Sequence, residues 1–254
     1  MPAKTDVLFQ PFTVKGVELS NRIVMAPMTR RKSPGNVPGP DVAGYYRRRT
    51  EGGVGLIITE GTFIRHKGAN GYDSVPDIYN DAALDGWKHV VEEVHTAGGK
   101  IIPQIWHVGA IREKGVEPDR EVPGYGPSAI ATGDRAVPEE MTLEDIKQCI
   151  ADFAEAAANA QKVGFDGVEV HGAHGYLVDQ FFWERSNQRN DEYGGSFENR
   201  NRFGREIVEA IRAATGPDFM IVFRFSQWKM DDYKAKLADT PEKLEQFLET
   251  LVAA

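Results

Sequence analysis

The chain has 254 residues, of which 41% are hydrophobic and 27% are charged, and its formal net charge is −8 at pH 7. This balance is typical of a soluble globular protein and excludes a disordered or collagen-like chain. The acidic net charge argues against nucleic acid as a partner, because binding to phosphates needs clustered basic side chains. The densest basic run, at 47–49, has acidic neighbours and is expected to form a solvated helix face.

The single cysteine, Cys149, excludes an internal disulfide and any zinc or iron–sulfur site that needs several cysteines of this chain. It lies beside an apolar helical stripe, so a small core residue is favoured over a nucleophile. The sequence shows no signal-peptide pattern and no apolar run near the roughly 20 residues of a membrane helix. We therefore expect a cytoplasmic protein with no membrane partner.

Short apolar runs alternate along the chain with longer helical patterns. A small hairpin is expected first, with its turn at Lys15-Gly16. Five apolar runs with little polar alternation follow, and such runs are typical of strands covered on both faces in a parallel sheet. These predicted strands are 22–28, 55–64, 100–107, 167–173 and 219–226.

Helices with clear boundary signals separate these strands. They are expected after Asn80, from Thr142, before Gly216 and from Thr240, and Asp145 follows Thr142 at the spacing of a capping box. Each has apolar residues at helical spacing that predict one buried face. These residues are Leu84, Trp87, Val91 and Val94; Ile146, Ile150, Phe153, Ala157 and Ala160; Phe203, Ile207 and Ile211; and Leu244, Phe247, Leu248, Leu251 and Val252.

The alternation of strands and helices predicts an α/β fold, either a doubly wound sheet or a (β/α)8 barrel. The sequence has no GxGxxG after the first strand and no GxxxxGK, which are the nucleotide-binding patterns of open sheets. Polar side chains instead follow the carboxyl ends of the strands, where barrel enzymes build their sites. We therefore expect one domain over 1–254, a TIM barrel with an N-terminal β-hairpin.

The number of strands disagrees with a complete barrel. A TIM barrel has eight strands in typically about 250 residues, whereas the sequence supplies only five. The connections 65–80 and 108–141 are long enough to be site-forming loops. The last apolar stripe, 244–252, has no following strand to cover it. The sequence therefore predicts only the first five βα units, with the fifth strand unpaired at one edge and this stripe exposed beside it.

The segment HGAHGYL, at 171–177, follows directly on a predicted strand. Its two imidazoles, His171 and His174, and the phenol of Tyr176 can grip a carbonyl oxygen and deliver a proton beside it. A metal site is a weaker alternative, because no cysteine is near and the HExxH spacing is absent, so no metal is expected. A third possibility is that the histidines only cap a turn.

The sequence resembles the Old Yellow Enzyme family of FMN-dependent NAD(P)H ene-reductases. The matching segments follow the family's order over nearly the entire chain, and HGAHGYL followed by DEYGGSFENRNRF is the most specific pair. The other segments are LFQPFTVKGVELSNRIVMAPMTR, GLIITEGTF and PQIWHVG. The resemblance implies a (β/α)8 barrel with FMN across its mouth.

The resemblance implies roles in flavin binding for six residues. The Thr29 hydroxyl would bind a ring carbonyl, and Gly61 would let the backbone approach the flavin. Arg224 would place a positive charge near N1 and O2 of the ring, where negative charge grows on reduction. The full implied set is Pro27, Met28, Thr29, Gly61, Gln104 and Arg224.

The resemblance also implies the substrate site. His171 and His174 would bind the carbonyl or nitro oxygen, and Tyr176 would donate a proton to the α-carbon. Trp106 and Tyr72 are candidate pocket walls. Packing in the core explains Trp106 equally well, and a surface loop is the better interpretation for Tyr72.

The implied reaction is the reduction of enones, enals or nitroalkenes, with NAD(P)H as the reductant of FMN. In the family, glycine-rich turns and an arginine after the seventh and eighth strands hold the FMN phosphate, and no such strands occur here. The alternative is therefore a truncated, non-catalytic remnant or a split subunit that pairs with a C-terminal barrel fragment or forms a homo-oligomer. A metal-dependent hydrolase is a third hypothesis.

Overall fold

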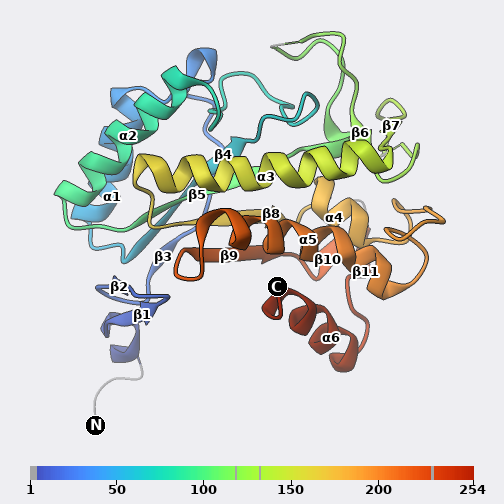
Figure 1. The fold of residues 1–254 in the computed structure, drawn as a ribbon. Helices are drawn as coiled ribbons and strands as arrows, with labels where there is room; N and C mark the ends of the chain where they lie inside the picture. The colour runs from blue at the N-terminus through green and yellow to red at the C-terminus, as the bar shows by residue number, and fades with distance from the viewer. Residues whose placement is uncertain (1–4, 118, 132, 230–231) are drawn as a thin grey trace.

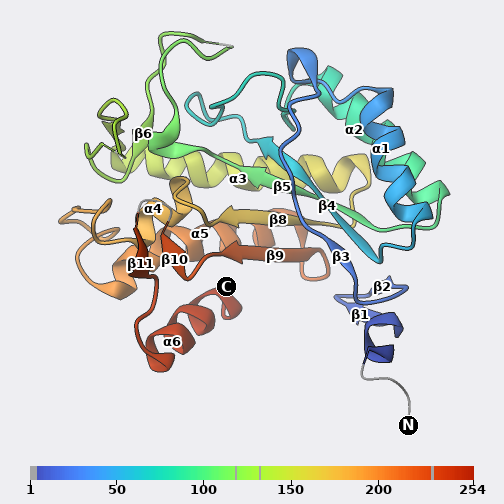
Figure 2. The same cartoon turned by 180° about the vertical axis from the view of Figure 1, so that it is seen from behind.

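The computed structural model describes residues 5–117, 119–131, 133–229 and 232–254. Its centre is a five-stranded parallel sheet in the order β3-β4-β5-β8-β9 (Figures 1 and 2). The five predicted strands are confirmed, although the first is shorter than 22–28. The strands are β3 (Val24–Met25), β4 (Leu56–Phe63), β5 (Ile101–Trp106), β8 (Gly167–Gly172) and β9 (Met220–Phe225).

One long helix follows each strand of this sheet. The helices are α1 (Pro40–Glu51), α2 (Asp81–Thr96), α3 (Leu143–Val163), α5 (Phe197–Thr215) and α6 (Pro241–Val252). Figure 1 shows α1, α2, α3 and α5 on one side of the sheet, and Figure 2 shows the strands from the other side. The five βα units form a curled, partial (β/α)8 barrel, as predicted. In the described part of the chain, no helix combines the length and apolarity needed to cross a bilayer.

The boundaries of α3 illustrate how local sequence sets these helices. The Thr142 hydroxyl accepts a hydrogen bond from the Asp145 amide at 3.1 Å, and the Asp145 carboxylate accepts one from the Thr142 amide at 2.9 Å. The helix ends at Gly164, whose φ of 100° suits glycine. Cys149 is buried in its apolar face, and burial raises the pKa of the thiol, which confirms a core residue.

Several short elements were not predicted, because they are too short for a clear hydrophobic period. The predicted hairpin is confirmed as β1 (Phe12–Val14) and β2 (Val17–Leu19). The unpredicted elements are β6 (Tyr125–Gly126), β7 (Glu139–Glu140), α4 (Leu177–Phe182), β10 (Trp228–Lys229), β11 (Asp232–Lys236) and the 3-10 turns η1 (Asp6–Phe9), η2 (Pro34–Asn36) and η3 (Gly109–Ile111). Two of these additions, α4 and β10, lie next to the candidate site.

The sheet is open at β9, which pairs within the described residues only with β8. The prediction of an exposed stripe on α6 is correct for Leu248 and Val252 but wrong for Phe247. The Phe247 ring packs edge-on against Phe182 at 5.1 Å and contacts Phe225 at 5.2 Å, so it is fully buried. The end of β9 and α4 therefore cover one side of α6, although no sixth strand lies beside it in the described structure.

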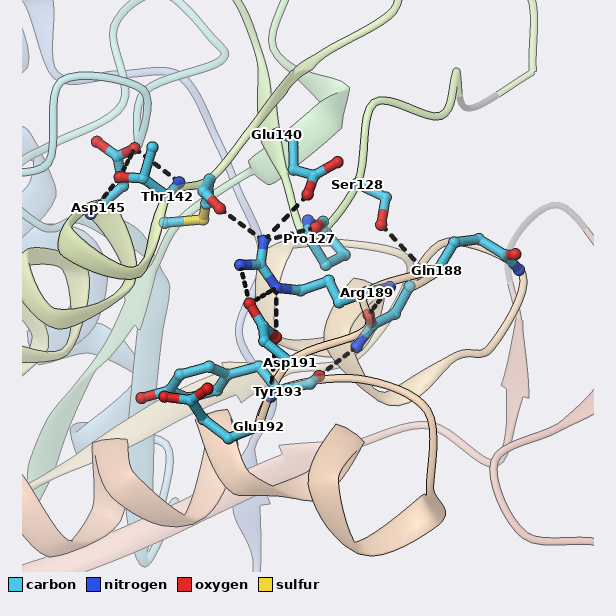
Figure 3. Close-up of polar contacts among 12 residues, drawn as sticks. Pro127, Ser128, Glu140, Thr142, Asp145, Gln188, Arg189, Asp191, Glu192 and Tyr193 are labelled. Atoms are coloured by element: carbon cyan, nitrogen blue, oxygen red, sulfur yellow. Dashed lines mark hydrogen bonds and ion pairs between the residues drawn. The ribbon is translucent and has the colours of Figure 1, made fainter.

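The segment SNQRNDEYGG, which contributed to the family resemblance, has a structural role around Arg189 (Figure 3). The Arg189 guanidinium donates to the carbonyls of Pro127 at 2.9 Å and Met141 at 2.5 Å, and it pairs with Asp191. The Asp191 carboxylate also accepts from the Tyr193 amide at 3.1 Å. One buried arginine therefore joins this segment to the long loop that precedes α3.

Candidate active site

A cavity of about 330 Å³ lies at the carboxyl ends of the strands, where barrel enzymes build their sites. Its volume is near the lower end of the range for small-molecule sites. All predicted site residues line it except Met28, Gly61 and Tyr72. The lining residues are Ala26, Pro27, Thr29, Gln104, Trp106, His171, His174, Tyr176 and Arg224.

The register of the sheet brings these side chains together. Gln104 on β5 lies opposite Glu169 on β8, and His171 on β8 lies opposite Arg224 on β9. Side chains two residues apart in a strand point to the same face, so Glu169 and His171 share the face that carries the cavity. Three neighbouring strands thus place an amide, a carboxylate, an imidazole and a guanidinium side by side.

Glu169 is the polar centre of this group and is not among the predicted site residues. Its side chain is buried, and it accepts a hydrogen bond from Gln104 Nε2 at 2.7 Å. It also accepts two from Arg224, from Nε at 2.8 Å and from Nη2 at 3.0 Å. The signal in the sequence was an acidic residue inside an apolar strand, two positions before His171. Such a residue needs a buried partner.

His171, His174 and Tyr176 converge as the sequence predicts. The His171 ring lies 5.4 Å from the His174 ring and 5.1 Å from the Tyr176 ring, measured between centroids. Burial lowers the pKa of His171 to about 3, with smaller contributions from His174 and the Arg224 charge. Burial and Arg224 also lower the pKa of His174, against an opposing contribution from Asp179. Both imidazoles are therefore neutral at pH 7.

Within the residues that the structure describes, no group of three or more His, Cys, Asp or Glu side chains is arranged to hold a metal ion.

Trp106 is both a core residue and a wall of the cavity, so both interpretations of its sequence position apply. Its indole stacks with Tyr72 at 5.7 Å and with His171 at 5.8 Å, and it meets Tyr176 edge-on at 4.7 Å. Its Nε1 is buried and has no hydrogen-bond partner among the described residues. A buried donor without a partner is uncommon in folded proteins.

Tyr72 is half-buried, so the surface interpretation of this residue is wrong. Its hydroxyl lies 3.3 Å from the Tyr176 hydroxyl, and its ring stacks on Trp106. The pKa of the Tyr176 phenol is raised, first by burial and then by the hydrogen bond with Tyr72. Tyr176 is therefore a protonated donor at neutral pH, and its hydroxyl lies within hydrogen-bond distance of the Tyr72 hydroxyl.

The structure does not place Gly61 or Met28 in the wall of the cavity. Met28 is 62% exposed. Gly61 lies in β4, where a Cβ atom would meet Trp106 Cε3 at 2.2 Å, far inside van der Waals contact. The missing side chain at this position makes room for the Trp106 indole.

An ion pair fixes the segment that carries Thr29. The next residue, Arg30, donates its amide to Glu60 at 3.0 Å and its guanidinium to the same carboxylate at 3.2 Å. Glu60 is fully buried, and the guanidinium also lies 3.8 Å from the centre of the Tyr45 ring. Because β4 holds the carboxylate, the backbone beside Thr29 is anchored at the cavity edge.

Comparison with known proteins is consistent with this geometry. Residues 7–253 match the NADH:flavin oxidoreductase / NADH oxidase family. The chain is 41% identical over 253 residues to 12-oxophytodienoate reductase 2 of Arabidopsis thaliana, covering 95% of this chain and 66% of that protein. It is 43% identical over 214 residues to 12-oxophytodienoate reductase 1 of Oryza sativa subsp. japonica, covering 82% of this chain and 56% of that protein.

Solved structures give the same result. Morphinone reductase in complex with tetrahydroNAD matches with a TM-score of 0.86 and 36% identity, over 95% of this chain and 69% of that one. Old Yellow Enzyme from a Pichia species matches with a TM-score of 0.87 and 36% identity, over 97% of this chain and 67% of that one. The chain thus spans between about half and somewhat over two thirds of the length of these proteins. It belongs to the NADH:flavin oxidoreductase / NADH oxidase family and, within it, to the Old Yellow Enzyme type that the sequence resemblance indicated.

Proposed function

We propose that this chain carries the ring-binding and catalytic half of an FMN-dependent NAD(P)H oxidoreductase that reduces activated C=C bonds in enones, enals and nitroalkenes. The observation that carries the proposal is the composition of one cavity. A hydroxyl, an amide and a guanidinium come from Thr29, Gln104 and Arg224, and two neutral imidazoles and a protonated phenol come from the end of β8 and the turn that follows it.

The residues present fit the ring of a flavin. Its carbonyl and nitrogen edge needs hydrogen-bond donors and positive charge, which Thr29, Gln104 and Arg224 supply. When bound, FMN would accept hydride from NAD(P)H and pass it to the β-carbon of the substrate. Pro27 lines the cavity. Met28 and Gly61 do not, so the flavin contacts that the resemblance implies for these two residues are part of the proposal but are not supported by the cavity wall.

The remaining steps belong to side chains of this chain. A neutral imidazole has one N–H to donate, so His171 and His174 can both bind the oxygen of an enone or nitro group. Polarising that oxygen draws electron density from the β-carbon and makes the double bond more reactive. Tyr176 keeps its proton at neutral pH and lies against His171, so it can donate to the α-carbon.

The names of the relatives support the same class of chemistry. Two are 12-oxophytodienoate reductases, and morphinone reductase is solved with tetrahydroNAD, a nicotinamide compound. Extending a nicotinamide reductant to this chain is part of the proposal. We also propose a cytoplasmic location, which imaging of the tagged protein in cells would test.

The test is flavin binding followed by turnover. The purified chain should quench the fluorescence of added FMN and then oxidise NADPH in the presence of cyclohexenone. Riboflavin, which lacks the phosphate, separates ring binding from phosphate binding. The non-catalytic alternative predicts no enone-dependent NADPH oxidation even with flavin bound, and the hydrolase alternative predicts a bound metal on elemental analysis and no response to NADPH. Either result would reject the proposal.

A further inference from the structure

The turn that carries His174 and Tyr176 has an unfavourable backbone conformation. His174 has a φ of 60°, in the left-handed region that residues with a Cβ atom rarely adopt, and Gly175 follows with a φ of 75°. Such a conformation persists only where surrounding contacts hold it. The contacts that hold this turn therefore determine where the imidazole and the phenol lie.

A buried ion pair contacts the backbone of this turn at Gly175. The Asp179 carboxylate, in α4, accepts a hydrogen bond from the Gly175 amide at 2.8 Å through Oδ2. Its other oxygen, Oδ1, lies 2.5 Å from Nζ of Lys229 in β10. Both charged side chains are only 1% exposed. A carboxylate buried this deeply is costly unless it is paired, and the contact with Lys229 offsets that cost while Asp179 holds the Gly175 amide.

The segment after β9 makes two further contacts with the same turn. The Ser226 hydroxyl accepts a hydrogen bond from the His174 amide at 3.1 Å. The Trp228 indole stacks on the His174 ring with centroids 5.4 Å apart and planes 25° apart. Residues 226–229 thus contact the turn at its backbone, at its imidazole and, through Asp179, at Gly175.

We propose that Lys229 is a positioning residue for the active site, which acts through the buried Asp179 carboxylate to hold His174 and Tyr176 in their cavity-lining conformation. Lys229 does not line the cavity itself. The proposal rests on the proposed function for what His174 and Tyr176 do. The coupling between Lys229 and the turn concerns conformation alone, so it can be measured on the protein without flavin.

The pair also contributes to the electrostatic environment of His174. His171 packs edge-on against its ring, the Arg224 charge lowers its pKa, and the Asp179 charge raises it. Lys229 neutralises Asp179 at the contact, so the pair adds less charge near the imidazole than either member alone would add.

The test is native-state amide exchange at Gly175, followed by NMR and compared with amides in the core of α3. In Lys229→Met the Asp179 carboxylate loses its partner, and we expect Gly175 to exchange about tenfold faster relative to α3. Lys229→Arg keeps the charge and should retain most of the protection. Lys234→Met, at an exposed lysine of β11, is the matched control and should leave Gly175 unchanged.

A double variant separates positioning from stability. Asp179→Leu with Lys229→Met removes both buried charges, so its melting temperature should recover relative to Lys229→Met alone. It has no acceptor for the Gly175 amide, so fast exchange there should persist. A folded Lys229→Met protein with wild-type Gly175 exchange would overturn the proposal. Wild-type Gly175 exchange in the double variant would also overturn it. Failure of both variants to fold would show that the ion pair only stabilises the fold, and it would overturn the proposal as well. Loss of Gly175 protection in a protein that never reduces enones would reject the proposed function and leave this inference intact.

Discussion

The Glu169 carboxylate accepts two hydrogen bonds from Arg224 on the neighbouring strand, from Nε at 2.8 Å and from Nη2 at 3.0 Å. This two-point contact fixes the plane of the guanidinium as well as its position. It also means that the positive charge implied for the flavin N1 edge is partly neutralised by a buried carboxylate. Gln104 donates to the same carboxylate, so Glu169 orients two of the implied flavin contacts at once.

Replacing Glu169 with Gln should raise the reduction potential of bound flavin. The substitution keeps the shape but leaves the Arg224 charge uncompensated, and a stronger positive field favours the reduced, more anionic ring. A gain of about 1.4 kcal/mol in that interaction corresponds to roughly 30 mV for a two-electron couple. Spectroelectrochemical titration of the flavin-loaded protein measures it. Glu245→Gln, at an exposed position of α6, is the control. An unchanged or lower potential would contradict this account of Glu169.

Gly61→Ala should destabilise the protein and disturb the cavity. The added Cβ would lie 2.2 Å from Trp106 Cε3, so the indole must shift within a packed core. Overpacking of this kind costs about 1–3 kcal/mol in the free energy of unfolding, which urea denaturation would measure. The affinity for riboflavin should fall as well, because Trp106 lines the cavity. Gly44→Ala is the comparison, since its Cβ would meet only the flexible end of Arg48 at 3.3 Å.

The sequence predicted the elements that have a long hydrophobic period or a capping pattern, and it predicted the site where a family motif marked the residues. The acidic residue at position 169 inside an apolar strand signalled a need for a buried partner, but the sequence did not reveal that Gln104 and Arg224 would be its partners. It misplaced Tyr72, because the fold of a long loop depends on tertiary contacts, here with Trp106 and Tyr176. The burial of Phe247 was likewise missed, because α4 was not predicted.

The stability of the protein should decrease as the pH falls from 7 to 5, because burial lowers the pKa values of His66, His107 and His171. His107 Nδ1 accepts from the Gly109 amide, so its Nε2 carries the proton and donates to His66 Nδ1 at 2.8 Å. The Gly68 amide also donates to His66 Nδ1, so a proton added there would break both contacts. Burial lowers the pKa of His66 to about 4 and also lowers that of His107.

A lowered pKa in the folded state means that the unfolded chain binds more protons between about pH 4 and 6.5, so stability rises with pH across this window. For His66 alone the loss between pH 7 and 5 should be about 2 kcal/mol. Urea unfolding at both pH values measures it. His66→Gln should reduce the pH dependence, whereas His89→Gln, at an exposed position, should not. An equally steep dependence in both variants would assign the effect to other groups.

Tyr176→Phe should separate the two half-reactions of the proposed enzyme. The phenol lies against His171 and keeps its proton because burial and Tyr72 raise its pKa, so it can serve the step in which the α-carbon is protonated. Reduction of the flavin by NADPH needs no such proton and should be largely unchanged. Loss of a positioned proton donor typically slows the dependent step by about 10²–10⁴-fold. Stopped-flow absorbance of the flavin measures each half-reaction separately.

Tyr72→Phe is the matched variant, because it removes the hydroxyl 3.3 Å from Tyr176 while keeping the ring that stacks on Trp106. It should slow enone reduction less than Tyr176→Phe does, since it leaves the donor itself in place. Equal slowing of both half-reactions in Tyr176→Phe would show that the residue positions ligands rather than donating the proton.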